Sequence, residues 1–254
     1  MSRRRSGLLA RAADRLPDWL VEPVPRDHRE TDEAFRRRRR VTAGVAVGGA
    51  GLLGISLSTK PGSLAFYGLT MAVAGTWVGG GLASGPLHLG WTFTPDRQLR
   101  RPVVTPVITG VGAFGAFYGA ALVARRIPIL DRAITGVMRY AQQGSTPLVA
   151  TTALANGVAE EVFFRGALYA AVGVDRPVLV STAVYGLATA ATRNPALLLA
   201  SLVMGTLFGM QRRVTGGIQA SVLTHVTWSA LMLRYLPPLF ADRPDVHDPR
   251  PAAA

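Results

Sequence analysis

Long apolar stretches separated by short charged turns make up most of this chain. Seven stretches carry no Asp, Glu, Lys or Arg, and most of them have the length of about 20 residues that an α-helix needs to cross a bilayer. These stretches cover residues 41–59, 61–95, 102–124, 140–159, 177–192, 194–211 and 214–233. The pattern predicts an all-α fold, in the form of a polytopic transmembrane helix bundle of about seven or eight spans.

The same pattern predicts where the individual helices run. We expect membrane helices over residues 41–59, 63–84, 103–124, 147–172, 177–192, 195–211 and 217–236. One further segment, residues 128–143, is amphipathic, because its apolar positions repeat at helical spacing and its other face is polar. These apolar positions are Leu130, Ile134, Val137, Met138 and Ala141. We therefore expect this segment to form a helix that lies at the membrane interface.

Glycine is frequent in the apolar stretches, and four pairs have GxxxG spacing. The pairs are Gly44 with Gly48, Gly75 with Gly79, Gly115 with Gly119, and Gly205 with Gly209. Such small residues let two helix backbones approach closely in a membrane. Because the chain contains 28 glycines, chance explains a share of these matches.

The charge of the chain is strongly positive, with 28 Lys and Arg against 15 Asp and Glu. Twelve arginines precede residue 41, and five of them form the run 36–40 directly before the first apolar stretch. This is the positive-inside pattern, so we expect a cytoplasmic N-terminus. We interpret the run as a topology anchor that touches anionic lipid headgroups rather than as a nucleic-acid site. Residues 8–20 are expected to form a short interfacial helix.

These features divide the chain into four parts. Residues 1–40 form a basic cytoplasmic segment, and residues 41–146 hold the N-terminal transmembrane helices and the interfacial helix. Residues 147–236 hold the remaining helices. Residues 237–254 are polar and rich in proline, so we expect a flexible tail.

The absence of cysteine excludes disulfides, thiolate metal sites and a cysteine nucleophile. A metal ion would need His, Glu, Asp or Asn as ligands. The chain has four histidines, of which His88 and His225 are expected near membrane depth. His88 has Pro86 and Gly90 as neighbours, which are typical of a helix end.

Two adjacent carboxylates, Glu160 and Glu161, precede Arg165 inside an apolar stretch. Charged residues at such depth usually face a bundle interior or a wet cavity and carry function. Glu161 and Arg165 are four residues apart and share a helix face, whereas Glu160 is turned away by about 100°. We expect Glu161 and Arg165 to neutralise each other and Glu160 to face a cavity as a base or ligand. The alternative is that the pair only fixes helix packing.

His225 lies in the last apolar stretch, with Ser229 one turn later on the same face. Its pKa range and its ligand chemistry make it a natural partner for Glu160 in activating water. A hydrogen bond between two helices is the simpler alternative.

These residues resemble the motifs of the CPBP family, the CAAX prenyl protease type II and bacteriocin-processing intramembrane proteases. EEVFFR at residues 160–165 fits the EExxxR motif of that family, and HVTWS at residues 225–229 fits its final histidine helix. The resemblance covers about residues 147–236, which are interpreted as the protease core. It implies that Glu160 activates the hydrolytic water, that Glu161 and Arg165 are its motif partners, and that His225 is the last histidine.

Two positions depart from the family's motifs. Where FxxxH is expected, the chain has Tyr185 followed by Thr189, and Ser229 stands where the family has asparagine. The resemblance implies a divalent metal such as zinc, held by Glu160 and His225, but Thr189 offers no imidazole as a further ligand. Ser229 or Thr189 is instead expected to donate a hydrogen bond to the tetrahedral oxyanion.

The function implied by the resemblance is that of an intramembrane endopeptidase. Its expected partners are membrane lipid and a membrane-proximal peptide or protein substrate, and the Arg-rich, Ala-rich composition indicates a bacterial plasma membrane. The alternative is a catalytically inactive relative that serves as a membrane scaffold or regulator. An ion or proton transporter ranks third, because the repeats and broken helices of many transporters are not evident.

Overall fold

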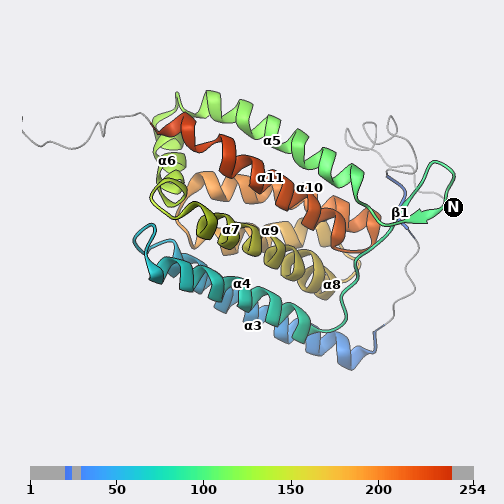
Figure 1. Cartoon of the computed structure of the whole chain (residues 1–254). Helices are drawn as coiled ribbons and strands as arrows, with labels where there is room; N and C mark the ends of the chain where they lie inside the picture. Colours follow the sequence, from blue (N-terminus) through green and yellow to red (C-terminus); the bar gives the residue numbers. More distant parts are fainter. Residues whose placement is uncertain (1–20, 25–29, 242–254) are drawn as a thin grey trace, which may run out of the picture.

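Figure 1 shows the computed structural model of the chain, which describes residues 21–24 and 30–241. The described part is a bundle of helices with one short two-stranded ribbon, so the all-α class is confirmed. The expected helix at residues 8–20 lies outside the described residues.

Each predicted apolar stretch contains a helix, and the helices run back and forth along the long axis of the bundle (Figure 1). The predicted amphipathic segment is also helical and forms α6. A π-helix, η1 (Glu161–Leu168), joins α7 to α8, and a 3-10 turn, η2 (Pro237–Phe240), follows α11. Strand β1 (Thr92–Phe93) pairs antiparallel with β2 (Leu99–Arg100). The α-helices are α3 (Asp32–Ser56), α4 (Leu64–Ser84), α5 (Val104–Ala124), α6 (Pro128–Gln142), α7 (Thr146–Glu160), α8 (Tyr169–Val172), α9 (Pro177–Ala190), α10 (Pro195–Thr215) and α11 (Gln219–Tyr235).

Several boundaries differ from the prediction, such as the end of α10 at Thr215 rather than 211, and two further differences change the picture of the fold. Helix α3 begins at Asp32 rather than at 41, because the Thr31 side chain accepts a hydrogen bond from the Ala34 amide and caps the helix. The arginine run therefore belongs to this helix. The expectation of a flexible tail from residue 237 is wrong for η2, where Phe240 is 3% exposed and packs with Leu236. Residues 242–254 lie outside the described part.

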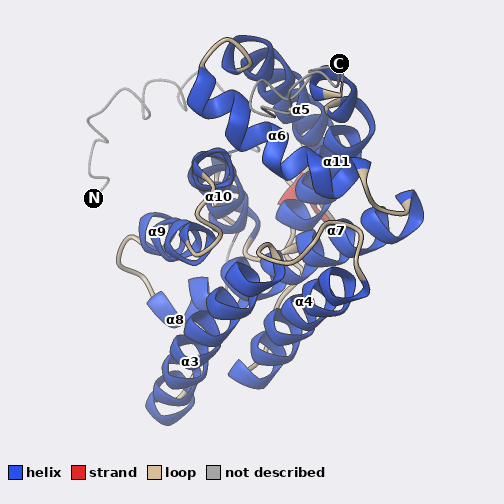
Figure 2. Ribbon diagram, turned by 90° about the vertical axis from the view of Figure 1, so that its left-hand side faces the viewer, coloured by secondary structure: helices blue, strands red, loops and turns tan. Residues whose placement is uncertain are grey.

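The core lies where α4, η1 and α9 meet. Trp77 of α4 stacks on Phe163 with ring centroids 4.7 Å apart, and Phe164 packs against Tyr185 of α9 at 4.6 Å. In Figure 2, α3 and α4 lie side by side, and α7 lies between α4 and α11. The helix that carries the two adjacent glutamates is thus packed on several sides by other helices.

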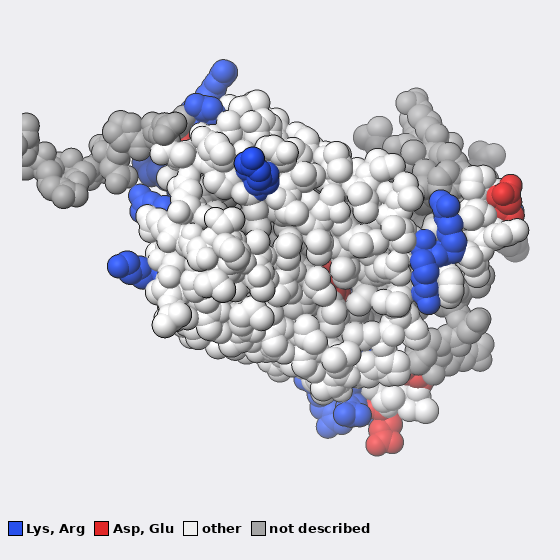
Figure 3. Space-filling view, viewed as in Figure 1, with Lys and Arg blue, Asp and Glu red and all other residues white. Residues whose placement is uncertain are grey.

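The surface has a wide apolar zone. Lys and Arg side chains gather toward the ends of the face in Figure 3, and the middle of that face is almost free of them. Large apolar side chains are exposed on several helices, such as Val47, Ile108, Leu187 and Val203. Among the described helices, α5 is the one that is long and apolar enough to cross a membrane by length and composition. The count of seven or eight spans stays a prediction.

The GxxxG pairs differ from one another in their surroundings. An added Cβ atom at Gly205 or Gly209 would touch α9, at 3.1 Å from Thr182 Cγ2 and 3.0 Å from Val178 Cγ1. This pair therefore serves the close packing of α10 on α9. The other three pairs have nothing within 4 Å of an added Cβ atom, so among the described residues they do not mark a close approach of two helices.

The glycine at position 49 is instead essential for packing. We expect Gly49→Ala to lower the stability by about 1–3 kcal/mol, because its methyl group would overlap the buried Trp77 ring. Gly48→Ala is the matched control, since nothing lies within 4 Å of its added Cβ atom. Thermal unfolding of the purified variants checks this expectation. Equal midpoints for the two variants would contradict the packing of α3 on α4.

Candidate functional site

The EEVFFR segment is not regular α-helix. From Glu161 to Leu168 the backbone is a π-helix, a rare conformation that is frequent at functional sites. The Arg165 carbonyl oxygen in this segment accepts a hydrogen bond from Arg212 Nε of α10, at 2.8 Å. The expectation of one continuous helix over 147–172 missed this change of pitch, which sets how the charged side chains are directed.

Glu161, Arg165 and His225 form a buried polar cluster. Glu161 Oε1 lies 3.3 Å from Arg165 Nη1 and 3.1 Å from His225 Nδ1. Glu161 and Arg165 are fully buried, and His225 is 6% exposed. The ion pair between Glu161 and Arg165 forms as predicted. The His225 imidazole, however, forms its hydrogen bond with Glu161 rather than with Glu160, because α11 packs against the glutamate helix on the side that Glu161 faces.

Aromatic rings surround the Arg165 guanidinium. Its Cζ atom lies 4.6 Å from the ring centroid of Tyr185 and 5.1 Å from that of Phe208. Gly205 leaves room for it, since an added Cβ atom there would lie 3.2 Å from Arg165 Nη2. Cation–π contacts thus add to the single carboxylate in stabilising this buried charge. The sequence reading had not assigned Phe208 or Gly205 to the site.

Glu160 has a different environment from Glu161. It is only half-buried, and its Oε2 atom accepts a hydrogen bond of 2.5 Å from the Tyr185 hydroxyl of α9. Sequence reasoning noted Tyr185 only as a departure from the motif. The available signal was a phenol inside an apolar helix, because a buried tyrosine hydroxyl usually finds a polar partner.

The imidazole of His225 is fixed by close packing. It stacks on Phe208 with ring centroids 4.8 Å apart and planes inclined by 21°. On the α7 side it faces Gly157, where an added Cβ atom would lie 3.3 Å from His225 Cδ2. Gly157 therefore allows α11 to bring the imidazole beside the two glutamates. The sequence analysis did not identify Gly157 as part of the site.

The two hydroxyl residues expected at the oxyanion do not join the cluster. Thr189 Oγ1 donates its hydrogen bond to the Tyr185 carbonyl oxygen at 2.9 Å. Ser229 lines an apolar cavity of about 360 Å³, together with Trp228 and Ala153. Within the described residues no hydrogen bond links Ser229 to Glu160 or His225. The Thr189 hydroxyl is engaged by the helix backbone in this arrangement, and its role at the oxyanion stays a prediction.

The donor set does not fit a zinc site. Zinc in proteins takes three or four N, O or S ligands from side chains, and the described residues contain no group of three or more His, Asp or Glu side chains suited to a metal ion. Glu161 is engaged by Arg165 and His225, and Thr189 supplies no imidazole. His88 lies beyond α4 and lines a different cavity.

Comparison with protein-family models matches residues 142–231 to the family described as Type II CAAX prenyl endopeptidase Rce1-like. The match includes the π-helix and the helices that carry Tyr185 and His225. No curated protein matches this chain. No solved structure matches it either.

Proposed function

We propose that this chain, which belongs to the type II CAAX prenyl endopeptidase family through residues 142–231, is an intramembrane endopeptidase in which Glu160 activates the hydrolytic water. The main support for this proposal is that the two adjacent glutamates have different environments. Glu161 is fully buried and engaged by Arg165 and His225. Glu160 is the less buried residue of the two, and we infer that its carboxylate, rather than that of Glu161, meets the water and the substrate.

The contact with Tyr185 supports this role of Glu160. The phenol occupies one carboxylate oxygen, Oε2, which fixes the side chain and leaves the other oxygen to accept the proton of a water molecule. The water oxygen then attacks the carbonyl carbon of the peptide bond while its proton moves to Glu160. Transfer of that proton to the departing amine nitrogen completes the cleavage.

His225 supports the transfer of the proton. Its Nδ1 atom lies against the Glu161 carboxylate, and a carboxylate partner on Nδ1 favours the tautomer that carries its proton there. Nε2 is then an acceptor that can relay a proton between Glu160 and the leaving group. Glu161 thus orients the imidazole, as the third group of a catalytic triad does.

The apolar surface supports a position inside a membrane. Members of the family are integral membrane proteins, and the exposed side chains of α4, α5, α9 and α10 are largely apolar. We place the chain in a bacterial plasma membrane, with the basic start of α3 on the cytoplasmic side. As substrate we propose a membrane-proximal peptide or protein segment that reaches Glu160 from the membrane.

The test is cleavage of a mixed peptide library by the purified protein in lipid nanodiscs, read by mass spectrometry. Products that appear with the unaltered protein and disappear in Glu160→Gln support the proposal. A catalytically inactive scaffold, the less favoured alternative, yields no products in either preparation.

Tyr185→Phe is expected to lower kcat by about tenfold, since loss of one hydrogen bond to a charged group costs about 1.5–3 kcal/mol, of which the transition state feels a part. The phenyl ring keeps the contacts with Arg165 and Phe164, so unfolding should be unchanged. Tyr118→Phe is the control, because Tyr118 packs against Phe114 in α5. Equal kcat values for the two variants would contradict the role of the phenol.

A further inference from the structure

A short β-hairpin lies at one end of the bundle, between the end of α4 and the start of α5 (Figure 1). Its two strands pair Thr92 with Arg100 and Phe93 with Leu99. Because successive side chains of a strand point to opposite faces, Phe93 and Leu99 share one face, and Thr92 and Arg100 share the other. The hairpin therefore has one apolar face and one polar face.

Trp91 and Arg101 extend the apolar face by one further pair. The Arg101 guanidinium carbon lies 3.7 Å from the centroid of the Trp91 ring, so this pair continues the register of Phe93 and Leu99. Arg97 adds a second guanidinium, 5.8 Å from the Phe93 ring centroid. Tryptophan and long cationic side chains whose stems lie along apolar surface are typical of the interface between a membrane and water.

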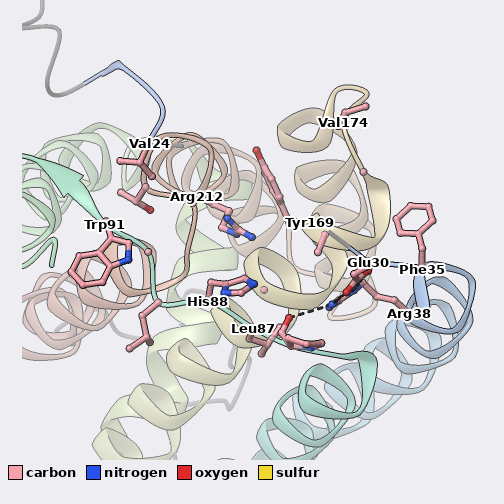
Figure 4. A pocket seen from close by; sticks show the side chains of 18 of the residues that line it. Val24, Glu30, Phe35, Arg38, Leu87, His88, Trp91, Tyr169, Val174 and Arg212 are labelled. Atoms are coloured by element: carbon pink, nitrogen blue, oxygen red, sulfur yellow. Dashed lines mark hydrogen bonds and ion pairs between the residues drawn. The ribbon is translucent and has the colours of Figure 1, made fainter. Parts of the chain in front are cut away.

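The apolar face of the hairpin is open in the described structure. Trp91 is 42% exposed and Leu99 is 51% exposed, and Leu89, just before the hairpin, is 53% exposed. Figure 4 shows Trp91 at one edge of a large cavity of about 930 Å³ and Arg38 of α3 at the opposite edge, so α3 does not cover the Trp91 ring. Exposed apolar side chains gathered in one place mark a surface that contacts a partner or a membrane.

Hydrogen bonds at its base hold the hairpin in place. The Trp91 amide donates to the Thr215 carbonyl oxygen at 2.8 Å, and Arg101 Nη1 donates to the Gly90 carbonyl oxygen at 2.8 Å. Gly90 has φ +90°, and an added Cβ atom there would lie 2.6 Å from the Gly217 nitrogen. The turn between α10 and α11 thus fixes the position of the apolar face, so a contact made by this face needs little ordering.

The charge of the hairpin is positive. Three arginines, Arg97, Arg100 and Arg101, stand against one carboxylate of the hairpin itself, Asp96. Glu22 is a second carboxylate, and it pairs with Arg97 at 2.8 Å. Within the described residues Arg101 forms no ion pair with a carboxylate. The guanidinium on the apolar face is therefore suited to contact an anion, and its planar shape matches the oxygens of a phosphate group.

From these observations we infer that the apolar face of the hairpin docks on the headgroup region of an anionic lipid leaflet. The Trp91 and Leu99 side chains enter between the headgroups, and the Arg101 guanidinium contacts lipid phosphate oxygens. The arginine run 36–40 of α3 lies at the same end of the bundle, so both basic segments meet the same leaflet. This inference rests on the membrane position proposed above and does not depend on peptidase activity.

The experiment uses the absence of cysteine from the chain, because a single introduced cysteine then carries the only spin label. Leu99→Cys places the label on the docking face, and Arg100→Cys places it on the opposite face of the same strand. Val111→Cys tests the membrane position itself, because Val111 is 50% exposed on α5. Electron paramagnetic resonance in nanodiscs that contain phosphatidylglycerol measures how well each label is reached by oxygen, which concentrates in lipid, and by a nickel complex, which stays in water.

The three labels give distinct results. We expect oxygen to reach the label at position 99 and the nickel complex to reach the label at position 100. Equal access of the nickel complex to both, with the label at position 111 still in lipid, would refute the docking while the membrane position stands. Access of the nickel complex to position 111 would contradict the membrane position, on which the docking rests. Protection of position 99 from both reagents would mean that protein, such as a second copy of the chain, covers the face instead of lipid.

Arg101→Gln tests the contribution of charge to the docking. In the chain labelled at position 99, this change should lower the ratio of docked to undocked hairpin by about fivefold, the effect of about 1 kcal/mol per basic residue near a headgroup. Arg100→Gln is the matched control and should have a smaller effect, since it removes the same charge from the opposite face. Equal effects of the two variants would overturn the inference, because the apolar face would then not determine the contact.

Discussion

Glu160→Gln is expected to lower peptide cleavage by about 10²–10⁴-fold, the contribution of a well-placed general base. The amide has nearly the size of the carboxylate, and its oxygen can still accept the hydrogen bond from the Tyr185 hydroxyl. It cannot take a proton from water at neutral pH. The measurement is the initial rate of cleavage of an identified peptide by the purified variant in nanodiscs.

The control for this variant is its unfolding midpoint. Because Glu160 is half-buried and outside the contact between Glu161 and Arg165, the midpoint should stay close to that of the unaltered protein. If Glu160→Gln lost both activity and fold, its lower rate would not report on catalysis. Glu160→Asp then separates the effect on catalysis from the effect on folding, because it keeps the negative charge. Unchanged cleavage by a folded Glu160→Gln would refute the role of Glu160 as the base.

The segments of the bundle could be predicted because hydrophobicity and helix ends are local properties. Each apolar stretch contains a helix, and the i,i+4 spacing of Glu161 and Arg165 gave the ion pair that the structure contains. Contacts between different helices could not be predicted from such local properties. The hydrogen bond from Tyr185 to Glu160 and the one between His225 and Glu161 join residues of different helices, so they depend on how α9 and α11 pack on the glutamate helix.

The glycines show the same limit. Gly205 and Gly209 fit the GxxxG rule, yet Gly49 and Gly157, which belong to no predicted pair, make contacts as close. Each of them faces a large ring, Trp77 or His225. Whether a glycine is needed depends on the side chain opposite it, and spacing along one helix does not contain that information.

The π-helix could not be predicted either. Over only eight residues, the spacing of apolar positions does not distinguish a π-helix from an α-helix. Its consequence is structural as well as chemical. The Arg165 carbonyl oxygen accepts from Arg212, which lines the large cavity, while the Arg165 side chain pairs with Glu161. A single residue thus joins the end of α10 to the buried polar cluster.

Glu161→Gln is expected to destabilise the fold by about 3–5 kcal/mol, the cost of leaving one partner of a buried ion pair uncompensated. Glu161 is the carboxylate that contacts Arg165 in the described structure, and no hydrogen bond to Arg165 Nε or Nη2 is present among the described residues. Arginine cannot lose its charge in a protein, so it would remain cationic between aromatic rings. Equilibrium unfolding of the purified variant measures the free-energy change.

The opposite substitution separates charge from packing. Arg165→Met should cost less than Glu161→Gln, because the remaining Glu161 keeps His225 as a partner and can also take up a proton. The double variant Glu161→Gln with Arg165→Met should regain part of the lost stability, since it buries no uncompensated guanidinium.

Arg97→Met is the control for a surface ion pair. Arg97 pairs with Glu22 at 2.8 Å and is 63% exposed, and such a pair contributes about 0–1 kcal/mol. Equal losses for Glu161→Gln and Arg97→Met would mean that water reaches the buried cluster and solvates Arg165.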